Sequence, residues 1–459
     1  MKPIRLHKVL SAIGVSTNQY PNTLIKHVSD RLDRFGERTV IFHLRKTVEL
    51  DVRRFKALRS TYIVTDQPFL KKQQLPIERL IFVPNVEQAY LEFIRFYRSQ
   101  FNIPVVAVTG TVGKTTTKEM IKQALSKEFN VVGTIRSKNN LRHNHRYLMS
   151  IDDTTDVAVF ETAMTHAGNL IIESEFFRPT IGVMTTIGFD HLNQLKTMDH
   201  YTRAKGEMLA ALNYEGTLIL NNDDERIRMI DLSPFKGKIV TFGIKEKAEF
   251  QATDITFEEN GMRFTLVYKD KAYPTYIPGL GVHQVSNALA ALAALNELGM
   301  DLKKAIGYLS LFEPIRSHTA LLKGINGSMI IDDTWSSNPT SLKSALAVLT
   351  EKGKDKVKIA VIGRINYLGD HEQRVYEQIG KMIVDHEVDY VIISDYAAKR
   401  IGESAIKHGL QPNRYLLLPN REELAGRLKR LLNSQAVVLM KVSMLDDSYR
   451  DILNEITEK

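Results

Sequence analysis

The stretch from Val105 to Thr117, VVAVTGTVGKTTT, constrains the fold of this 459-residue chain more than any other segment. Its first four residues are apolar and mostly β-branched, which predicts a buried parallel strand. Gly110 and Gly113 permit a tight turn, and Lys114 opens a run whose apolar residues have helical spacing. A strand, a glycine turn and a helix in this order predict a phosphate-binding loop.

The residue types of this loop define its expected chemistry. Glycines let backbone N–H groups close on phosphate oxygens, and the helix N-terminus adds positive potential. Lys114 would reach the β and γ phosphates, and the Thr115 hydroxyl can hold Mg²⁺. The spacing is a contracted GxxGKT, because Val108 stands where a full Walker loop has glycine. An ordinary turn with a fortuitous lysine is the alternative, and the correctly placed strand and helix argue against it.

Composition excludes several classes of protein. With 43% hydrophobic and 25% charged residues, a chain of this length is globular, with about three domains. It has no cysteine, which rules out disulfides, thiolate metal sites and cysteine nucleophiles and fits a reducing compartment. No apolar run is long enough to span a bilayer, and the N-terminus lacks the apolar core of a signal peptide. We therefore expect a cytoplasmic protein without a membrane span.

The net charge of +9 raises the possibility of nucleic-acid binding. The basic residues, however, are scattered among acidic ones, and no recognition helix, zinc finger or RNP motif is present. We therefore expect a generally basic surface, partly due to an anion-binding cleft, and no nucleic-acid partner.

The alternation of patterns predicts an α/β protein of three domains. Residues 1–103 combine strands at 38–45, 60–66 and 78–85 with a helix at 86–101 and carry no catalytic motif. In residues 104–314 strands alternate with helices, which predicts a parallel-sheet ATPase domain built around the phosphate loop. Residues 315–459 repeat this alternation and predict a smaller, doubly wound, Rossmann-like domain.

Polar residues follow two strands of the predicted central sheet. Glu161 ends one strand, and the loop after the strand ending near Thr185 contains Asp190 and His191. Ligands of such sheets sit beyond the carboxyl ends of the strands, so Glu161 and His191 should lie near the phosphate loop. A lone histidine is usually structural, and this expected position is what favours a functional role for His191.

Three later segments are less specific. The helical stretch 199–212 carries Lys205, which its spacing alone would make a surface charge. The polar residues 221–224 after a strand could meet a nucleotide or simply form a turn. A strong alanine-rich helix at 281–298 places His283 and Asn287 on one face.

With these motifs in this order, the chain resembles the Mur ligase family of ATP-dependent amide ligases over essentially its whole length. The family's phosphate loop usually reads G(T/S)NGKTTT, and the matching ATP-binding positions here are Gly110, Thr111, Gly113, Lys114, Thr115 and Thr116. The stretch GVHQVSNALAA at 281–291 matches the adenine-side GxHNxxNxxAA motif, which carries over His283 and Asn287, while Gln284 departs.

The resemblance also implies a metal centre with two Mg²⁺ ions. Glu161 in ETAM and His191 in TTIGFDHL match the family's magnesium-binding residues, and they would act together with Thr115. Lys205 in TRAKGEM matches a lysine that is carbamylated in many members and then helps to hold the second metal. Arg316 stands where the family has an arginine entering the last domain. Lys114, Lys205, His191 and Arg316 are therefore the expected catalytic residues.

The remaining motifs concern the substrates. IIDDTWSSNPTS at 330–341 is similar to the DDxYNANPxS loop of the member that adds D-alanyl-D-alanine, and it implies an ATP-side role for Asp333 and substrate contacts for Asn338 and Ser341. The segment 137–148 keeps Asn139 and Asn140 of the family's NxNNxIGxP but loses the Ile-Gly. Two further departures are KVSM at 441–444 in place of KGSR, and Arg364 in place of an acidic residue.

The resemblance implies an ATP-dependent ligase that works through an acyl phosphate. It would add D-alanyl-D-alanine to a UDP-linked muramoyl tripeptide in cell-wall precursor synthesis, with residues 1–103 binding the UDP-type acceptor, and it would be a monomer. A specialised member that joins another carboxylate and amine is the main alternative. A P-loop ATPase or kinase would leave 281–291 and 330–341 unexplained. A non-catalytic nucleotide-binding protein predicts loss of key residues, yet Lys114, Glu161, His191 and Lys205 are all present.

Overall fold

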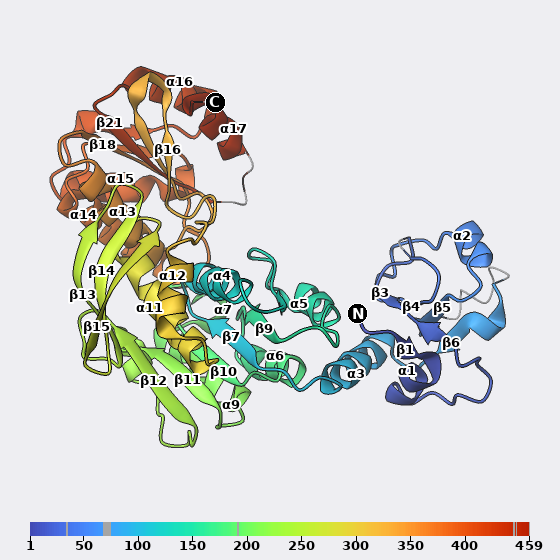
Figure 1. The fold of residues 1–459 in the computed structure, drawn as a ribbon. Coiled ribbons are helices and arrows are strands. Elements are labelled where there is room, and N and C mark those ends of the chain that lie inside the picture. The colour runs from blue at the N-terminus through green and yellow to red at the C-terminus, as the bar shows by residue number, and fades with distance from the viewer. Residues whose placement is uncertain (34, 68–74, 191, 444–445, 447, 459) are drawn as a thin grey trace. The chain divides into compact units, whose positions relative to one another are not determined.

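The computed structural model is an α/β protein, as the sequence predicts (Figure 1). The structure describes all residues except 34, 68–74, 191, 444–445, 447 and 459. Two compact units share the chain. The first contains Met1–Val105, Phe129–Phe160 and Ile172–Arg178, and the second contains Val106–Glu128, Glu161–Ile171 and Pro179–Lys459. Both units are therefore built from separated segments of the sequence.

The first unit contains a four-stranded parallel sheet. Its strands are, in spatial order, β3 (His27–Ser29), β4 (Thr39–Phe42), β5 (Tyr62–Thr65) and β6 (Leu80–Phe82). The three strands predicted in this region are confirmed as β4, β5 and β6. Other elements of this unit are β1 (Ile4–Arg5), α1 (Leu6–Ala12), β2 (Leu24–Ile25), α2 (Val52–Ala57), β8 (Val131–Gly133), α5 (Leu141–Leu148) and β9 (Val157–Glu161), whose last residue belongs to the second unit.

The helix predicted at 86–101 is α3 (Val86–Ser99), which begins where the Asn85 side chain accepts from the Gln88 amide at 3.0 Å. Its aromatic stripe is core rather than ligand site, because Phe93 stacks on Phe42 of the sheet with ring centroids 5.5 Å apart. The same apolar cluster includes Leu148, Ile151, Phe160, Phe176 and Phe177 from the later segments of the unit.

The strands of the phosphate-loop sheet that belong mainly to the second unit have the order β15-β14-β13-β12-β11-β10-β7. The strands are β7 (Val105–Thr109), β10 (Ile181–Met184), β11 (Thr217–Asn221), β12 (Lys238–Gly243), β13 (Phe250–Phe257), β14 (Gly261–Tyr268) and β15 (Lys271–Pro278). Pairing is parallel from β7 to β13 and antiparallel from β13 to β15. The sheet is therefore mixed, because strands joined by short turns, as β13 to β15 are, pair antiparallel.

The helices of the second unit beside this sheet are α4 (Lys114–Leu125), α7 (Leu192–Leu195), α8 (Met198–Gly206), α9 (Met208–Ala211), α10 (Glu225–Arg228), α11 (Val282–Glu297) and α12 (Leu302–Leu309). The helix α6 (Asn169–Phe177) begins in the second unit and continues into the first. The alanine-rich α11 is almost entirely buried and packs against α4 and the sheet, because its small side chains allow close approach. The stretch predicted as one helix at 199–212 forms α8 and α9, which are interrupted at Glu207.

The last part of the chain forms a six-stranded sheet with strand order β16-β17-β21-β18-β19-β20. The strands are β16 (Ala320–Lys323), β17 (Met329–Asp332), β18 (Val357–Ile362), β19 (Tyr390–Ile393), β20 (Tyr415–Leu417) and β21 (Ala436–Lys441), with only β16 antiparallel to its neighbour. The helices are α13 (Pro339–Lys352), α14 (Glu372–Asp385), α15 (Lys399–Lys407), α16 (Arg421–Leu431) and α17 (Ser448–Ile456).

Both faces of this sheet are covered. Along β18, Ala360 and Ile362 enter one apolar cluster while Ile359 and Val361 enter another. Alternate residues of a strand point to opposite faces, so the sheet is doubly wound, which confirms the Rossmann-like prediction. Among the described helices, none combines the length and apolar character needed to cross a membrane.

Candidate active site

The phosphate loop connects β7 to α4, and its two glycines are required by space and backbone. Gly110 and Gly113 have φ angles of 145° and 86°. A Cβ added at Gly110 would lie 2.0 Å from Thr185 Oγ1, and one at Gly113 would lie 2.4 Å from Asn287 Oδ1. No side chain fits at either position, so the close approach of the loop to its neighbours depends on glycine.

Lys114 lies folded over this loop. Its Nζ donates to the carbonyl oxygens of Gly110 and Thr111, each at 2.9 Å. The ammonium is therefore held beside the loop's own peptide groups, where it can exchange these carbonyls for phosphate oxygens.

Glu161 and Thr115 meet beside the loop. The Thr115 hydroxyl donates to Glu161 Oε2 at 2.8 Å, and the Glu161 side chain is buried. The predicted closeness of Glu161 to the phosphate loop is confirmed, whereas His191 lies outside the described residues. A hydroxyl and a carboxylate fit Mg²⁺, which takes one or two protein oxygens and completes its shell with water and phosphate. In the part of the chain that is described, no cluster of three or more His, Asp or Glu side chains could hold a metal.

Lys205 of α8 is buried, with 1% of its surface exposed. Its Nζ donates to Thr109 Oγ1 at 3.2 Å, at the end of β7, and lies 5.5 Å from the centroid of the Tyr201 ring. The interpretation of Lys205 as a surface charge is therefore wrong. Helical spacing could not reveal this, because α8 packs against the sheet with a face that includes the lysine.

The phosphate loop, the first turns of α11 and the segment after β17 line one cavity. Predicted residues at this cavity are Gly113, Thr116, His283, Asn287, Asp333 and Ser341. Burial lowers the pKa of His283 to about 4, so its imidazole is neutral at physiological pH. His318, Thr319 and Ser344 also line the cavity, and no sequence motif had indicated them.

Asp333 forms a buried ion pair that the sequence did not predict. Its Oδ2 accepts from Lys441 Nζ at 2.6 Å, and its Oδ1 accepts from the Thr319 amide at 3.2 Å. Lys441 also donates to the carbonyl of Ser336. The pair ties the ends of β17 and β21 together at the cavity, across 108 positions of sequence.

Other predicted site residues have structural roles. Asn338 and Ser341 form a reciprocal capping box at the start of α13, and Ser341 also lines the cavity. Asn140 caps α5, where its Oδ1 accepts from the His143 amide at 3.0 Å. The Asn139 carbonyl accepts from Asn144 Nδ2 at 3.0 Å. Arg316 is exposed and is not among the residues that line the cavity.

Two family models match the chain. The Mur ligase middle domain matches residues 108–295, and the Mur ligase glutamate ligase domain matches residues 319–444, which together exceed half of the chain. The chain belongs to the Mur ligase family. It is an ATP-dependent amide-bond ligase of the kind that acts in peptidoglycan precursor synthesis.

Individual relatives agree with this assignment. A UDP-N-acetylmuramoyl-tripeptide--D-alanyl-D-alanine ligase of Bacillus subtilis is 28% identical over 82% of this chain and 81% of its own. A crystal structure of MurF from Acinetobacter baumannii has a TM-score of 0.85 and 22% identity, covering 99% of both chains. MurF from Thermotoga maritima, solved in complex with ADP, has a TM-score of 0.79 and 21% identity, covering 94% of this chain and 96% of its own. The structural matches show a shared three-sheet fold.

Proposed function

We propose that this ligase joins D-alanyl-D-alanine to the terminal carboxylate of a UDP-N-acetylmuramoyl-tripeptide. The observation that carries the proposal is the cavity at which the phosphate loop, α11 and the segment after β17 meet. Support for the substrates comes from the Bacillus subtilis relative and from the NPTS motif of that segment. We assign acceptor binding to residues 1–103, ATP binding to 104–314 and cavity closure to 315–459.

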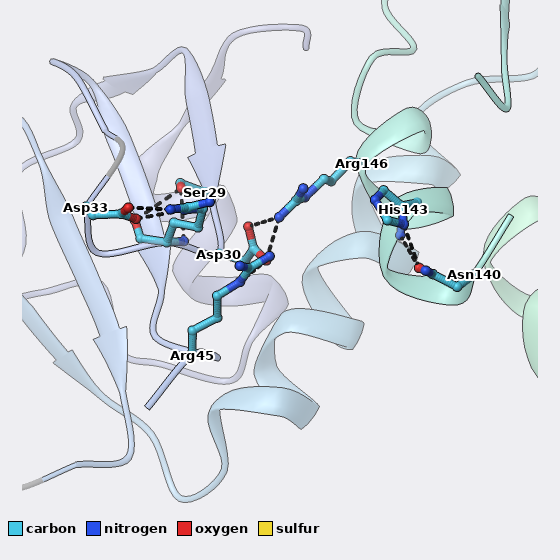
Figure 2. A network of polar contacts seen from close by, with 8 residues as sticks. Ser29, Asp30, Asp33, Arg45, Asn140, His143 and Arg146 are labelled. Atoms are coloured by element: carbon cyan, nitrogen blue, oxygen red, sulfur yellow. Dashed lines mark hydrogen bonds and ion pairs between the residues drawn. The ribbon is translucent and has the colours of Figure 1, made fainter. Parts of the chain in front are cut away.

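For the acceptor we propose the carboxyl edge of the small parallel sheet in the first unit. Figure 2 shows Arg45 and Arg146 both pointing toward Asp30, which follows β3. Asp30 is buried and accepts from Arg146 Nη2 at 2.6 Å and from Arg45 Nε at 3.3 Å. One carboxylate offsets only one of two guanidinium groups, so this edge suits an anionic acceptor such as a UDP-linked sugar. We also propose that Asn139 and Asn140, which match the family's substrate segment, contact the acceptor.

The chemical problem is that a carboxylate does not acylate an amine at neutral pH, because its oxygen is a poor leaving group. Transfer of the γ-phosphoryl group from ATP to the acceptor carboxylate converts that oxygen into phosphate. The two anions repel each other as they approach, and the transition state spreads charge over the phosphoryl oxygens. Lys114 and the N–H groups at the start of α4 would supply the compensating positive charge.

The residues that would hold Mg²⁺ are Thr115 and Glu161 for one ion, and His191 and carbamylated Lys205 for a second. When bound, the ions supply charge neutralisation between the acceptor carboxylate and the phosphates. Carbamylation would replace the buried Lys205 ammonium with a carboxylate, which changes a cation into a metal ligand.

Amide formation completes the proposed reaction. The amine of the added dipeptide attacks the acyl phosphate, the C–O bond to phosphate breaks, and ADP and phosphate remain as products. We propose that Asn338 and Ser341 contact the dipeptide. Arg316 and Asp333 would act at the cavity, where exclusion of water protects the acyl phosphate from hydrolysis.

The test is ADP release by purified protein with Mg²⁺ and ATP, with the muramoyl tripeptide and D-alanyl-D-alanine added singly and together. We expect release that needs both substrates and is lost in Lys114→Ala. ATP binding without stimulation by this pair would contradict the proposed substrates but not the ligase chemistry.

A second candidate is a specialised ligase that joins a different carboxylate and amine. The altered segment 137–148 favours it, because Lys138 and Arg142 stand there without an ion-pairing carboxylate among the described residues. If the muramoyl pair fails, amino-acid and peptide acceptors with additional carboxylates are the next substrates to assay.

A further inference from the structure

The phosphate loop is hydrogen-bonded to the segment that follows β10. The Thr111 amide donates to the Thr186 carbonyl at 2.6 Å, and Thr111 Oγ1 accepts from the Gly188 amide at 2.9 Å. The Thr185 hydroxyl donates to the Val112 carbonyl at 2.6 Å. The path of the loop is therefore set by where this segment lies.

This segment is held in turn by two side chains at the end of β11. Asn221 Nδ2 donates to the Thr185 carbonyl at 2.7 Å, and Asp224 Oδ2 accepts from the Ile187 amide at 2.7 Å. The other oxygen of Asp224 accepts from the Arg226 and Ile227 amides of α10, at 3.0 and 3.1 Å. Asp224 thus joins the segment 185–188 to the N-terminus of α10, and it reaches the phosphate loop only through that segment.

The neighbouring carboxylate serves a different loop. Asp223 accepts from the backbone amides of Ile244, Lys245 and Glu246 at 2.7 to 2.8 Å, in the turn after β12. Asp223 and Asp224 are therefore adjacent in sequence and each receives three backbone amide bonds, but only Asp224 reaches the segment behind the phosphate loop. The chain offers a matched pair for an experiment.

Phosphate binding depends on donors that are fixed before the ligand arrives. A displacement of the segment by a fraction of an ångström would be passed to the peptide groups of Thr111 and Val112 through their hydrogen bonds. A misplacement of 1 Å at a reacting centre can lower the rate by about 100-fold, so a smaller displacement of these peptide groups should still be measurable.

We propose that Asp224, together with Asn221, is a positioning residue that holds the phosphate loop in its nucleotide-binding geometry through the segment 185–188. This inference rests on the proposed ATP-binding role of the loop. It predicts that substitutions of Asn221 and Asp224 change nucleotide affinity although neither side chain contacts the nucleotide.

The test compares Asp224→Asn with Asp223→Asn in the full-length protein. Each change turns one acceptor oxygen into an NH₂ group that faces a backbone donor, so both should lower the melting temperature by similar amounts. Titration calorimetry with Mg²⁺ and a non-hydrolysable ATP analogue should show affinity about tenfold weaker for Asp224→Asn and within about twofold of wild type for Asp223→Asn. Equal affinities in the two variants would overturn the inference.

Asn221→Asp is a second variant in case Asp224→Asn does not fold. In the wild type, Asn221 Oδ1 accepts from the Asp223 amide at 3.0 Å, and the variant keeps an oxygen at this position. The second carboxylate oxygen replaces the NH₂ group and repels the Thr185 carbonyl. We expect a similar loss of analogue affinity, and unchanged affinity would overturn the inference. If the wild type binds no analogue, the proposed function fails as well, whereas normal wild-type binding with normal binding by both variants refutes only the positioning role.

Discussion

The Thr115 hydroxyl joins the phosphate loop to Glu161 at the end of β9. If both side chains hold Mg²⁺, removal of the hydroxyl should damage catalysis far more than folding. We expect Thr115→Val, which keeps the shape, to lower kcat by about 100-fold. Thr115→Ser keeps the hydroxyl and should stay within about tenfold of wild type. Steady-state ADP release at several Mg²⁺ concentrations measures both variants, and equal activity of Val and Ser at this position would contradict the assigned role.

The Lys441–Asp333 pair allows a prediction about stability at the residue scale. Both side chains are buried, so replacing Lys441 with methionine leaves the Asp333 carboxylate without its partner. We expect Lys441→Met to lower the free energy of unfolding by about 3 kcal/mol. The double variant Lys441→Met, Asp333→Leu removes both charges and should recover a large part of that loss, as measured by urea unfolding. A double variant no more stable than the single one would show that the ion pair is not the cause.

Residue-level prediction from the sequence succeeded where the chain itself fixes the position. Glu161 follows a buried strand, so the rule about carboxyl ends of parallel strands was sufficient to bring it to Thr115. Helical spacing failed for Lys205, whose burial depends on what packs against α8. The KVSM segment did not indicate that Lys441 pairs with Asp333, which follows another strand. Contacts between distant elements have no local pattern that could reveal them.

At the scale of elements, α5 contributes a buried histidine to the core of the first unit. His145 packs with its ring centroid 4.6 Å from that of Phe176 and 5.8 Å from that of Tyr90. Burial, with help from the nearby Arg95 and Arg142, lowers the pKa of His145 to about 4. Because the unfolded chain has a pKa near 6.5, it binds the proton more readily than the folded state does between these values.

Stability should therefore fall as the pH falls from about 6.5 toward 4. We expect the wild type to lose about 2 kcal/mol more than His145→Phe when the pH is lowered from about 7 to about 5. Urea unfolding at the two pH values measures this difference. Parallel curves for wild type and His145→Phe would contradict the prediction.

Most elements were predictable because their patterns are local. The strands β4, β5 and β6 and the helix α3 follow from β-branched runs and apolar spacing. The prediction was incomplete at β20, a three-residue strand of half-buried residues, which is too short to show a pattern. It was also incomplete at Glu207, whose Oε1 accepts from the Gly168 amide at 2.6 Å and so connects the break between α8 and α9 to the start of α6.

At the scale of the whole molecule, the way the units share the chain predicts which fragments can fold. All strands of the last sheet lie between Ala320 and Lys441, and apolar clusters cover both of its faces. The first unit, in contrast, takes Leu148, Ile151, Phe160 and Phe177 of its core from segments beyond the proposed domain of residues 1–103. Each such side chain is worth about 1.5–3 kcal/mol when buried, which is large against a typical domain stability of about 5–15 kcal/mol.

We therefore expect a fragment of residues 315–459 to unfold cooperatively on heating and a fragment of residues 1–103 to lack a cooperative transition. Circular dichroism melting with a dye that reports exposed apolar surface would measure both. Adding a peptide of residues 129–160 to the shorter fragment should reduce dye binding, because it returns Leu148, Ile151 and Phe160 to the core and brings Arg146 to Asp30. A cooperative transition of residues 1–103 alone would show that this domain forms its core without the later segments.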